Sequence, residues 1–428
     1  MGCCGDFATI HDAVCASGRN VGVRDTLPAD LPRLRKQISR EVSNSLPPMI
    51  RLALRMLYGA PKRAAAMVFG MSFAAFLMAQ QSAIFWGVMT WTYAPMRVVQ
   101  SQIWVAAPQV EQINDYDPLR LVDVQRVKSV AGVAWAVPAY SSYTYARMPD
   151  GRHQPVQLMG VDDVTLAGSP WQEIAGGADS LRLSDAVWMD DYGLDFLKPK
   201  GGPRLKVGDS FEINERRAVI TGVFPARRAF SGAPFIVTTF ERAVNYSLPQ
   251  RRLVSFVLAQ ASAGDDAAAV AKRIEQETGL RAFTDEAFVN STLLWWLRNT
   301  GVPGSFLTTV AFSLLFGLTV NAFIFSNFVS QHWKIFAALR AMGASGWKLI
   351  TMLLAQSMSM CLLCFGVGTL GAVLFGMAVK TRGLPPFLLT WEIVGGVFAA
   401  QVIVGVAGPV MSVLRLQRLQ PEEAFRNQ

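Results

Sequence analysis

The stretch HWKIFAALRAMGASGWKLI, from His332 to Ile350, decides how the rest of the chain is interpreted. It is basic and contains two glycines, and it lies between two long runs that carry no charged residue. A short charged piece between two apolar runs of bilayer length is typical of a connector between membrane-spanning helices. The stretch therefore predicts a membrane protein, provided that the flanking runs are long enough to cross a bilayer.

Four runs of the sequence lack Asp, Glu, Lys and Arg and meet that length. The hydrocarbon core requires about 20 helical residues, and a charge at its centre costs roughly 2.5–3.5 kcal/mol. The runs cover residues 64–96, 299–333, 349–379 and 393–414. The first run exceeds the bilayer by far, so we expect the first two spans to continue outward as a stalk, with an interfacial loop as the alternative.

The distribution of charge gives the orientation. The 428-residue chain is 51% hydrophobic and has a net charge of +9, yet the block from Arg97 to Arg298 holds 22 basic and 23 acidic residues. The basic excess therefore flanks the apolar runs, which is the pattern of cytoplasmic membrane flanks and excludes a nucleic-acid groove. We expect both termini and the connector in the cytoplasm of a bacterial inner-membrane protein, and the block from 97 to 298 outside.

The external block has the pattern of a folded α+β domain. Residues 205–224 alternate around a Gly-Asp turn, and residues 264–279 have helical spacing with an acidic start and a glycine stop. Strand patterns also cover residues 234–240, 252–260 and 280–284. The fold class predicted is four transmembrane helices with a large extracytoplasmic α+β domain between helices 1 and 2. Part of this domain should be the βαβ half of a split sandwich.

This reading divides the chain into six parts. Residues 1–48 have no apolar signal segment, and we expect a disordered extension or a start codon placed before a true start at Met49. The six parts are 1–48, 49–96 with the first span, 97–298 as the periplasmic domain, 299–333 with the second span, 334–348 as a coupling segment, and 349–428 with the last two spans and the tail.

The sequence contains no recognisable catalytic, metal-binding or phosphate-binding motif. His11, His153 and His332 are too dispersed for a metal or a catalytic triad, and Cys361 and Cys364 lie inside an apolar run, where core packing is favoured. No phosphate-binding G-x-x-x-x-G-K-[ST] loop occurs. We therefore expect no enzyme, no cofactor and no metal site, and any energy for transport should come from a partner.

The connector itself predicts either a docking helix or a plain interfacial turn. Phe336, Leu339 and Met342 share one face, and Gly343 is placed to end the helix. A short amphipathic helix without chemistry suits a groove on another protein, whereas snorkelling lysines would suit the membrane surface. The spacing alone leaves both possibilities open.

Residues 334–345, KIFAALRAMGAS, resemble the connector of FtsX/MacB-type ABC permeases. That connector runs roughly Glu, aromatic or aliphatic, small, aliphatic, Leu, Lys or Arg, Ala, aliphatic, Gly. The matching residues are Phe336, Leu339, Arg340, Ala341, Met342 and Gly343. Ile335 stands where the family usually has Glu, so a salt bridge from that position is not expected here.

Two further stretches are similar to the DevC-like branch of this superfamily. In the first span the branch has a Phe-Ala pair followed by Leu and then Gln. The corresponding residues here are Phe73, Ala74, Leu77 and Gln81. The tail LQPEEAFRNQ resembles the closing Pro-x-x-x-Phe-Arg of the branch, with Pro421, Phe425 and Arg426.

The resemblance implies a machine with several subunits. Such permeases work as homodimers or with a sibling permease, and two cytoplasmic ABC ATPase subunits bind the connector. ATP then moves the stalk and periplasmic domains, which is called mechanotransmission. DevC-like members associate with a membrane-fusion adaptor and an outer-membrane channel and are tied to lipid or glycolipid export. The coupling surface implied here consists of Phe336, Leu339, Arg340, Met342 and Gly343.

Other functions remain open at this point. A lipoprotein-releasing or a macrolide- or peptide-exporting relative would be the same machine with different cargo. An FtsX-like relative would switch a periplasmic hydrolase and transport nothing. A membrane-anchored receptor with an external sensing domain would need no ATPase partner at all.

Overall fold

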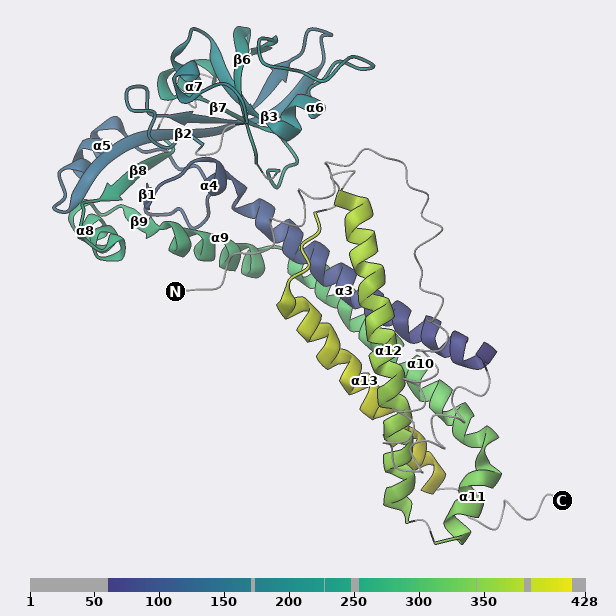
Figure 1. The fold of residues 1–428 in the computed structure, drawn as a ribbon. Helices are drawn as coiled ribbons and strands as arrows, with labels where there is room; N and C mark the ends of the chain where they lie inside the picture. Colours follow the sequence, from purple (N-terminus) through teal and green to yellow (C-terminus); the bar gives the residue numbers. More distant parts are fainter. Residues whose placement is uncertain are drawn as a thin grey trace, which may run out of the picture.

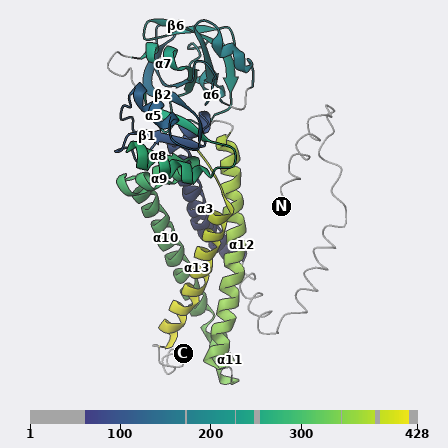
Figure 2. The same ribbon diagram turned by 90° about the vertical axis from the view of Figure 1, so that its left-hand side faces the viewer.

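The computed structural model describes residues 61–170, 174–226, 228–247, 254–343, 345–380 and 386–417. The chain forms an elongated molecule, with a mixed α/β domain at one end and a bundle of long helices at the other (Figure 1). A view turned by 90° shows the domain stacked on one end of the bundle and α11 (Trp333–Ala341) at the opposite end (Figure 2). The expected extensions at 1–48 and in the tail from 418 lie outside the described residues.

Four helices of the described chain are long and apolar enough to cross a membrane. They are α3 (Pro61–Thr92), α10 (Val302–Gln331), α12 (Gly346–Lys380) and α13 (Trp391–Gln417). Their apolar segments are Val68–Thr92, Val302–Gln331, Gly346–Val379 and Trp391–Val410. The four spans predicted from the sequence are therefore present, with the folded domain between the first and the second.

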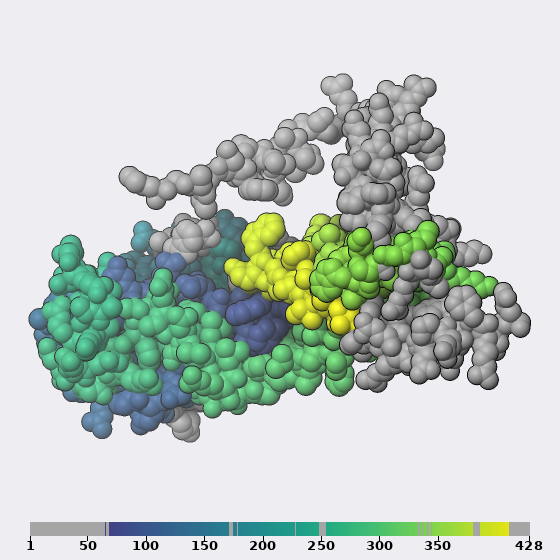
Figure 3. Space-filling model, turned by 90° about the horizontal axis from the view of Figure 1, so that it is seen from below, coloured from purple at the N-terminus to yellow at the C-terminus, as the bar shows by residue number. Residues whose placement is uncertain are grey.

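Small residues let the helices approach closely. The buried face of α3 carries Ala74, Ala75, Ala79 and Ala83, and a Cβ built on Gly368 of α12 would lie 2.6 Å from the Ala75 Cβ. Close contact between small residues is a main source of helix association in a membrane. Seen from below, the last span (yellow) lies against both the first (purple) and the third (green) (Figure 3).

Polar side chains inside the bundle bond to backbone carbonyls of neighbouring helices. The Asn321 side-chain amide on α10 donates to the Val404 carbonyl on α13. The Gln401 amide on α13 donates to the Met71 carbonyl on α3 at 3.3 Å. Cys361 and Cys364 are buried free thiols packed against α3 and α13, as expected for core cysteines. These contacts tie the helices to one another in a bundle that holds few other polar groups.

The membrane-proximal half of the domain, here called the proximal lobe, is an antiparallel sheet. Its strand order is β2 (Val133–Arg147), β8 (Phe256–Ala261), β1 (Ile103–Ala106) and β9 (Arg281–Thr284). β8, α8 (Ala267–Thr278) and β9 form the predicted strand–helix–strand succession, and β1 lies between the two strands in the sheet. α4 (Ala94–Val98), α5 (Leu121–Lys128) and α9 (Asp285–Asn299) complete this lobe.

The far half, the distal lobe, is a closed ring of strands. β2 pairs with β3 (His153–Val161), β3 with β7 (Phe235–Thr239), and β7 with β4 (Ala186–Asp190). β4 then pairs with β6 (Arg216–Phe224), β6 with β5 (Ser210–Ile213), and β5 with β2 again. η1 (Ala178–Arg182), α6 (Asp191–Phe196) and α7 (Phe240–Tyr246) pack around the ring. A second hydrophobic core fills it.

β2 joins the two lobes because its two halves pair with different strands. Residues 133–139 pair with β8 of the proximal lobe, and residues 140–147 pair with β3 of the ring. Side chains of β3, β4, β6 and β7 also enter the proximal core, among them Trp188 and Phe224. The lobes are therefore packed together over an apolar interface.

Two details differ from the sequence prediction. The hairpin between residues 205 and 224 turns at Asn214 and Glu215, both with positive φ, and not at the Gly-Asp pair. Neither of the first two spans continues unbroken toward the domain: α3 ends at Thr92 before the short α4, and α9 is separated from α10 by Thr300 and Gly301. A Tyr93 backbone outside the helical region and an extended Thr300 produce these breaks.

Candidate functional site

The connector between the second and third spans is the candidate site. α11 follows α10 directly, with the His332 N–H and its ring both bonded to the Phe328 carbonyl. The helix ends at Ala341, and Gly343, two residues further on, has a left-handed φ of 88° that favours glycine, close to the predicted helix end. Ser345 then begins α12, since its carbonyl accepts the Lys348 N–H at 3.0 Å. The connector is thus a defined helical turn.

Two of the predicted coupling residues face the bundle. Phe336 is 5% exposed and packs among side chains of α10 and α12, and Leu339 is half-buried against the same group. The members of this cluster are Phe325, Phe328, Val329, Phe336, Met352, Leu353 and Met360. Phe336 and Leu339 therefore hold the connector on the two spans and do not offer a free apolar surface.

The exposed apolar surface of the connector is made by other residues. Met342 is 76% exposed, Trp347 71% and Ile335 41%, and Lys334 and Lys348 beside them are exposed as well. We call Ile335, Met342 and Trp347 the exposed triplet. Arg340 belongs to α11, and its side chain lies outside what the structure describes. Helical spacing identified one face of α11, but it could not tell which face turns toward the spans.

Of the residues that carried the DevC-like resemblance, Phe73 and Gln81 lie on α3 and not at the connector. Phe73 lies on α3, where its ring contacts those of Phe69, Phe76 and Phe316. Gln81 is half-buried two turns further along the same helix. Pro421, Phe425 and Arg426 lie outside the described residues. These positions stay predictions with no common site.

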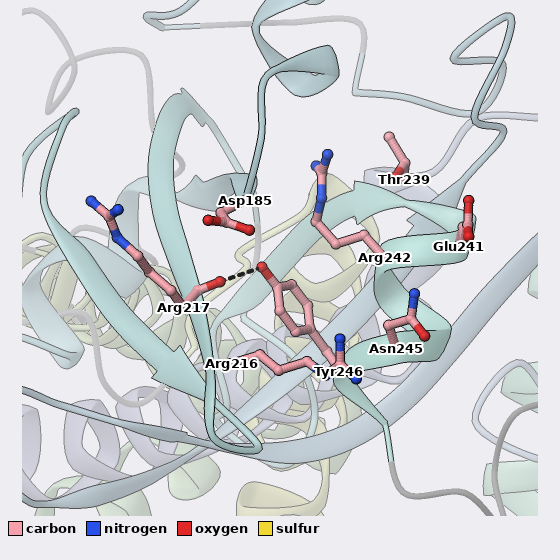
Figure 4. A pocket seen from close by; sticks show the side chains of 8 residues that line it. All are labelled: Asp185, Arg216, Arg217, Thr239, Glu241, Arg242, Asn245 and Tyr246. Carbon is pink, nitrogen blue, oxygen red and sulfur yellow. Dashed lines mark hydrogen bonds between the residues drawn. The ribbon is translucent and has the colours of Figure 1, made fainter.

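A polar cavity of about 500 Å³ lies on the distal lobe, between α7 and the start of β6 (Figure 4). The Arg242 guanidinium donates to the carbonyls of Leu181, Leu183 and Ala186 and to the Thr238 hydroxyl. The Tyr246 hydroxyl donates to the Arg217 carbonyl at 2.7 Å. Burial raises the pKa of Tyr246 to about 12, so it stays a donor. Both side chains therefore hold the wall of the cavity together.

The described residues contain no group of three His, Cys, Asp or Glu side chains close enough to hold a metal ion. The described chain has the connector with its exposed triplet at one end, four spans, and the two-lobed domain at the other end.

Two sequence-family models match the chain. Residues 64–277 match the MacB-like periplasmic core domain, and residues 307–421 match the FtsX-like permease C-terminal domain. No curated protein matches the chain by sequence.

Three solved structures are similar to part of the chain. The extracellular domain of the noncanonic ABC-type transporter YknZ from Gram-positive bacteria is 15% identical, with a TM-score of 0.32, over 43% of this chain and 100% of that one. The periplasmic region of MacB from Actinobacillus actinomycetemcomitans is 11% identical, with a TM-score of 0.34, over 48% and 96%. A domain of a putative permease from Porphyromonas gingivalis is 13% identical, with a TM-score of 0.29, over 42% and 88%. These low TM-scores carry no argument.

The fold defines a multi-pass inner-membrane protein with an extracytoplasmic α+β domain between its first two spans. The two family models together cover the first span, the domain and the remaining spans. The chain belongs to the FtsX/MacB-type ABC permease family. It is thus a transmembrane permease component, and members of this family generally work with ABC ATPase partners.

Proposed function

We propose that this chain is the permease subunit of an ATP-driven exporter that works by mechanotransmission. A separate cytoplasmic ATPase subunit would dock on the connector, and its ATP-driven movement would tilt the spans and thereby move the domain outside. The observation that carries the proposal is the exposed triplet at the end of the bundle opposite the domain. An apolar surface of this kind, next to exposed lysines, fits a groove on a soluble partner.

The energy source follows from the composition of the spans. The sequence from Leu349 to Val379 and the three other apolar runs contain no Asp, Glu, Lys or Arg. Ion- and proton-coupled transporters usually carry such groups on their pathway, so an external source of energy is favoured. On this proposal both termini and the connector are cytoplasmic, which agrees with the basic flanks.

The finer assignment rests on the DevC-like resemblance of the first span and the tail. It supports a homodimer or a dimer with a sibling permease, a periplasmic adaptor with an outer-membrane channel, and a lipid, glycolipid or other hydrophobic cargo. Finding genes for an adaptor and a channel beside this one would support export. Finding a hydrolase in their place would favour an FtsX-like switch.

The test is co-purification of the detergent-solubilised chain with an ATPase subunit. We expect the ATPase to copurify with wild type and to be lost from a Met342→Ala/Trp347→Ala double variant. Trp391→Ala is the matched control, because Trp391 is also an exposed tryptophan at the start of a span, but at the opposite end of the bundle. If no ATPase binds wild type, the alternative of a membrane-anchored receptor with an external sensing domain is favoured. If the double variant retains it fully, the exposed triplet is not the docking surface.

A further inference from the structure

The first and second spans, α3 and α10, reach the domain at one junction, and the helix is interrupted there in both cases. α3 ends at Thr92, before Tyr93 leaves the helical conformation. α10 begins at Val302. It is preceded by Thr300, whose backbone is extended, and by Gly301, whose backbone is in the helical region. Such breaks in the helical hydrogen-bond ladder are natural hinges. What lies between them decides whether a movement of the spans reaches the domain or is absorbed.

Trp296 is the last residue of α9 on the face that packs on the domain. Phe288 and Thr292 precede it by two turns and one turn, and both are fully buried. The Thr292 hydroxyl accepts the Ile113 N–H at 3.2 Å. The Trp296 ring lies 4.2 Å from the Phe230 ring, centroid to centroid. Trp296 therefore forms the final contact of this buried stripe before the helix break.

Phe230 brings the distal lobe to this junction. It belongs to the segment 228–234, which leads into β7 of the ring. The neighbouring Ala229 is buried in the proximal core. The Arg228 guanidinium lies 3.7 Å above the Tyr192 ring of α6, and the Pro234 carbonyl accepts the Gln157 N–H of β3. The segment is thus fixed in the distal lobe on both sides of Phe230.

Two amides connect the same tryptophan to the first span. The Trp296 indole N–H donates to the Gln112 side-chain carbonyl at 3.2 Å. The Asn114 amide donates to that same oxygen at 3.3 Å and to the Thr92 carbonyl, at the end of α3, at 2.8 Å. The end of the first span, the helix before the second span and a segment of the distal lobe therefore meet through four side chains.

We propose that Gln112, Asn114, Phe230 and Trp296 form a junction clamp that holds the end of the first span and the last turn of α9 against the domain. With the clamp closed, α9 follows the domain up to Thr300, so bending is confined to the breaks at Tyr93 and at Thr300–Gly301. Without it the last turn of α9 detaches, and a movement of α10 is lost in that flexible turn. The four residues position the helices. The role in transmission rests on the proposed function, whereas the clamp itself does not.

The test that needs no partner is hydrogen exchange on the full chain in lipid nanodiscs. Aromatic pairs stabilise by an amount that corresponds to a change of about 3- to 10-fold in a local opening equilibrium. We expect Trp296→Ala to speed exchange of residues 293–299 and 228–234 by that factor and to leave β1 and β8 unchanged. Leu297→Ala is the control, because Leu297 is next to Trp296 in the same helix but is 40% exposed. Exchange equal to wild type in Trp296→Ala, or equally fast in both variants, would overturn the clamp.

A second arm separates the clamp from the proposed function. With the ATPase bound, ATP should alter exchange in the distal lobe of wild type, and Trp296→Ala should lose that response while still retaining the ATPase. Trp296→Phe, which keeps an aromatic ring toward Phe230, should restore part of it. A full response in Trp296→Ala would overturn transmission through the clamp. No ATPase or no ATP response in wild type would overturn the proposed function, and the first arm would still decide whether the clamp exists.

Discussion

At the residue scale, Gly368 marks a close approach between two spans. A Cβ added there would lie 2.6 Å from the Ala75 Cβ and 2.7 Å from the Ser72 carbonyl oxygen of α3. Because a backbone cannot yield as a flexible side chain does, Gly368→Val should lower the free energy of unfolding by roughly 1–3 kcal/mol. Thermal unfolding in detergent measures this. Gly366→Val, on the same helix with nothing within 4 Å of its Cβ, should change little, and equal losses in both variants would contradict the packing explanation.

Asp190 gives the distal lobe a pH-dependent stability. Burial raises the pKa of this carboxyl to about 7, with a smaller contribution from Asp191, while the N–H groups of Phe235 and Gly193 and the charge of Arg228 act in the opposite sense. In the unfolded chain the pKa is about 3.9. Between about pH 4 and pH 7 the unfolded state therefore loses the proton first, so stability should fall as the pH rises, and level off above about pH 7.

Asp190→Asn removes this titration and keeps the side-chain oxygen that accepts the Gly193 N–H at 2.9 Å. We expect the variant to lose the decline between about pH 4 and pH 7. Denaturant unfolding of both proteins across this range gives the comparison, since all other titrating groups are shared. Parallel curves for the two proteins would mean that Asp190 does not carry the effect.

These two residues show what the sequence reveals at this scale. The stripe of Gly368, Ala372 and Gly376 could be predicted as a packing face, since small residues spaced by four are informative by type alone. The burial of Asp190 could not be predicted, because this residue ends a strand that the pattern did not reveal and is buried by strands distant in the chain. Of the exposed triplet, Met342 was among the predicted coupling residues, whereas Ile335 and Trp347 were not, because the helical spacing singled out only one face of the connector.

At the scale of elements, different residues of the connector are expected to serve the stability of the bundle and the docking of the ATPase. Phe336→Ala should destabilise the bundle by about 3–5 kcal/mol, the usual cost of removing a buried phenylalanine, because its ring fills the space between α10 and α12. Met342→Ala should leave unfolding within about 0.5 kcal/mol of wild type and weaken ATPase binding. Thermal unfolding and co-purification on the same samples distinguish the two. A Met342→Ala variant as unstable as Phe336→Ala would refute this division.

The elements themselves were predictable where their signals are local. The four spans and the β8–α8–β9 unit could be predicted because their lengths, periodicity and caps depend on contiguous residues. In α8, for example, the Asp266 side chain accepts the Ala268 and Ala269 N–H groups, and Gly279 ends the helix in the left-handed region. The ring of the distal lobe was not predictable. Its closure depends on pairing β2 with both β3 and β5, and on parallel pairs such as β3 with β7, whose partners are far apart in sequence.

At the scale of the molecule, the domain and the bundle are two bodies with separate cores. The proximal and distal cores begin at Ala94 and take no side chain from α10, α12 or α13, and the bundle cores take none from the domain. The ends of the domain are held near each other, since Arg97 of α4 forms an ion pair with Asp285 of α9 at 2.9 Å. A domain cut from the spans should therefore lose no core contact.

We expect residues 94–299, expressed alone, to fold cooperatively and without detergent. Residues 94–284 should be far less stable, because that truncation removes α9 and with it Phe288, which is fully buried and stacked on Phe283 at 4.7 Å. Removing a buried aromatic side chain costs about 3–5 kcal/mol, a large part of the stability of an ordinary domain. Circular dichroism with thermal unfolding of both fragments makes the comparison. If residues 94–299 fail to unfold cooperatively, the domain needs the spans to fold and the two bodies are not independent. If residues 94–299 unfold cooperatively as expected, the domain and the bundle are independent bodies. Motion between them is then left to the junction clamp and to the two places where the chain passes from a span to the domain.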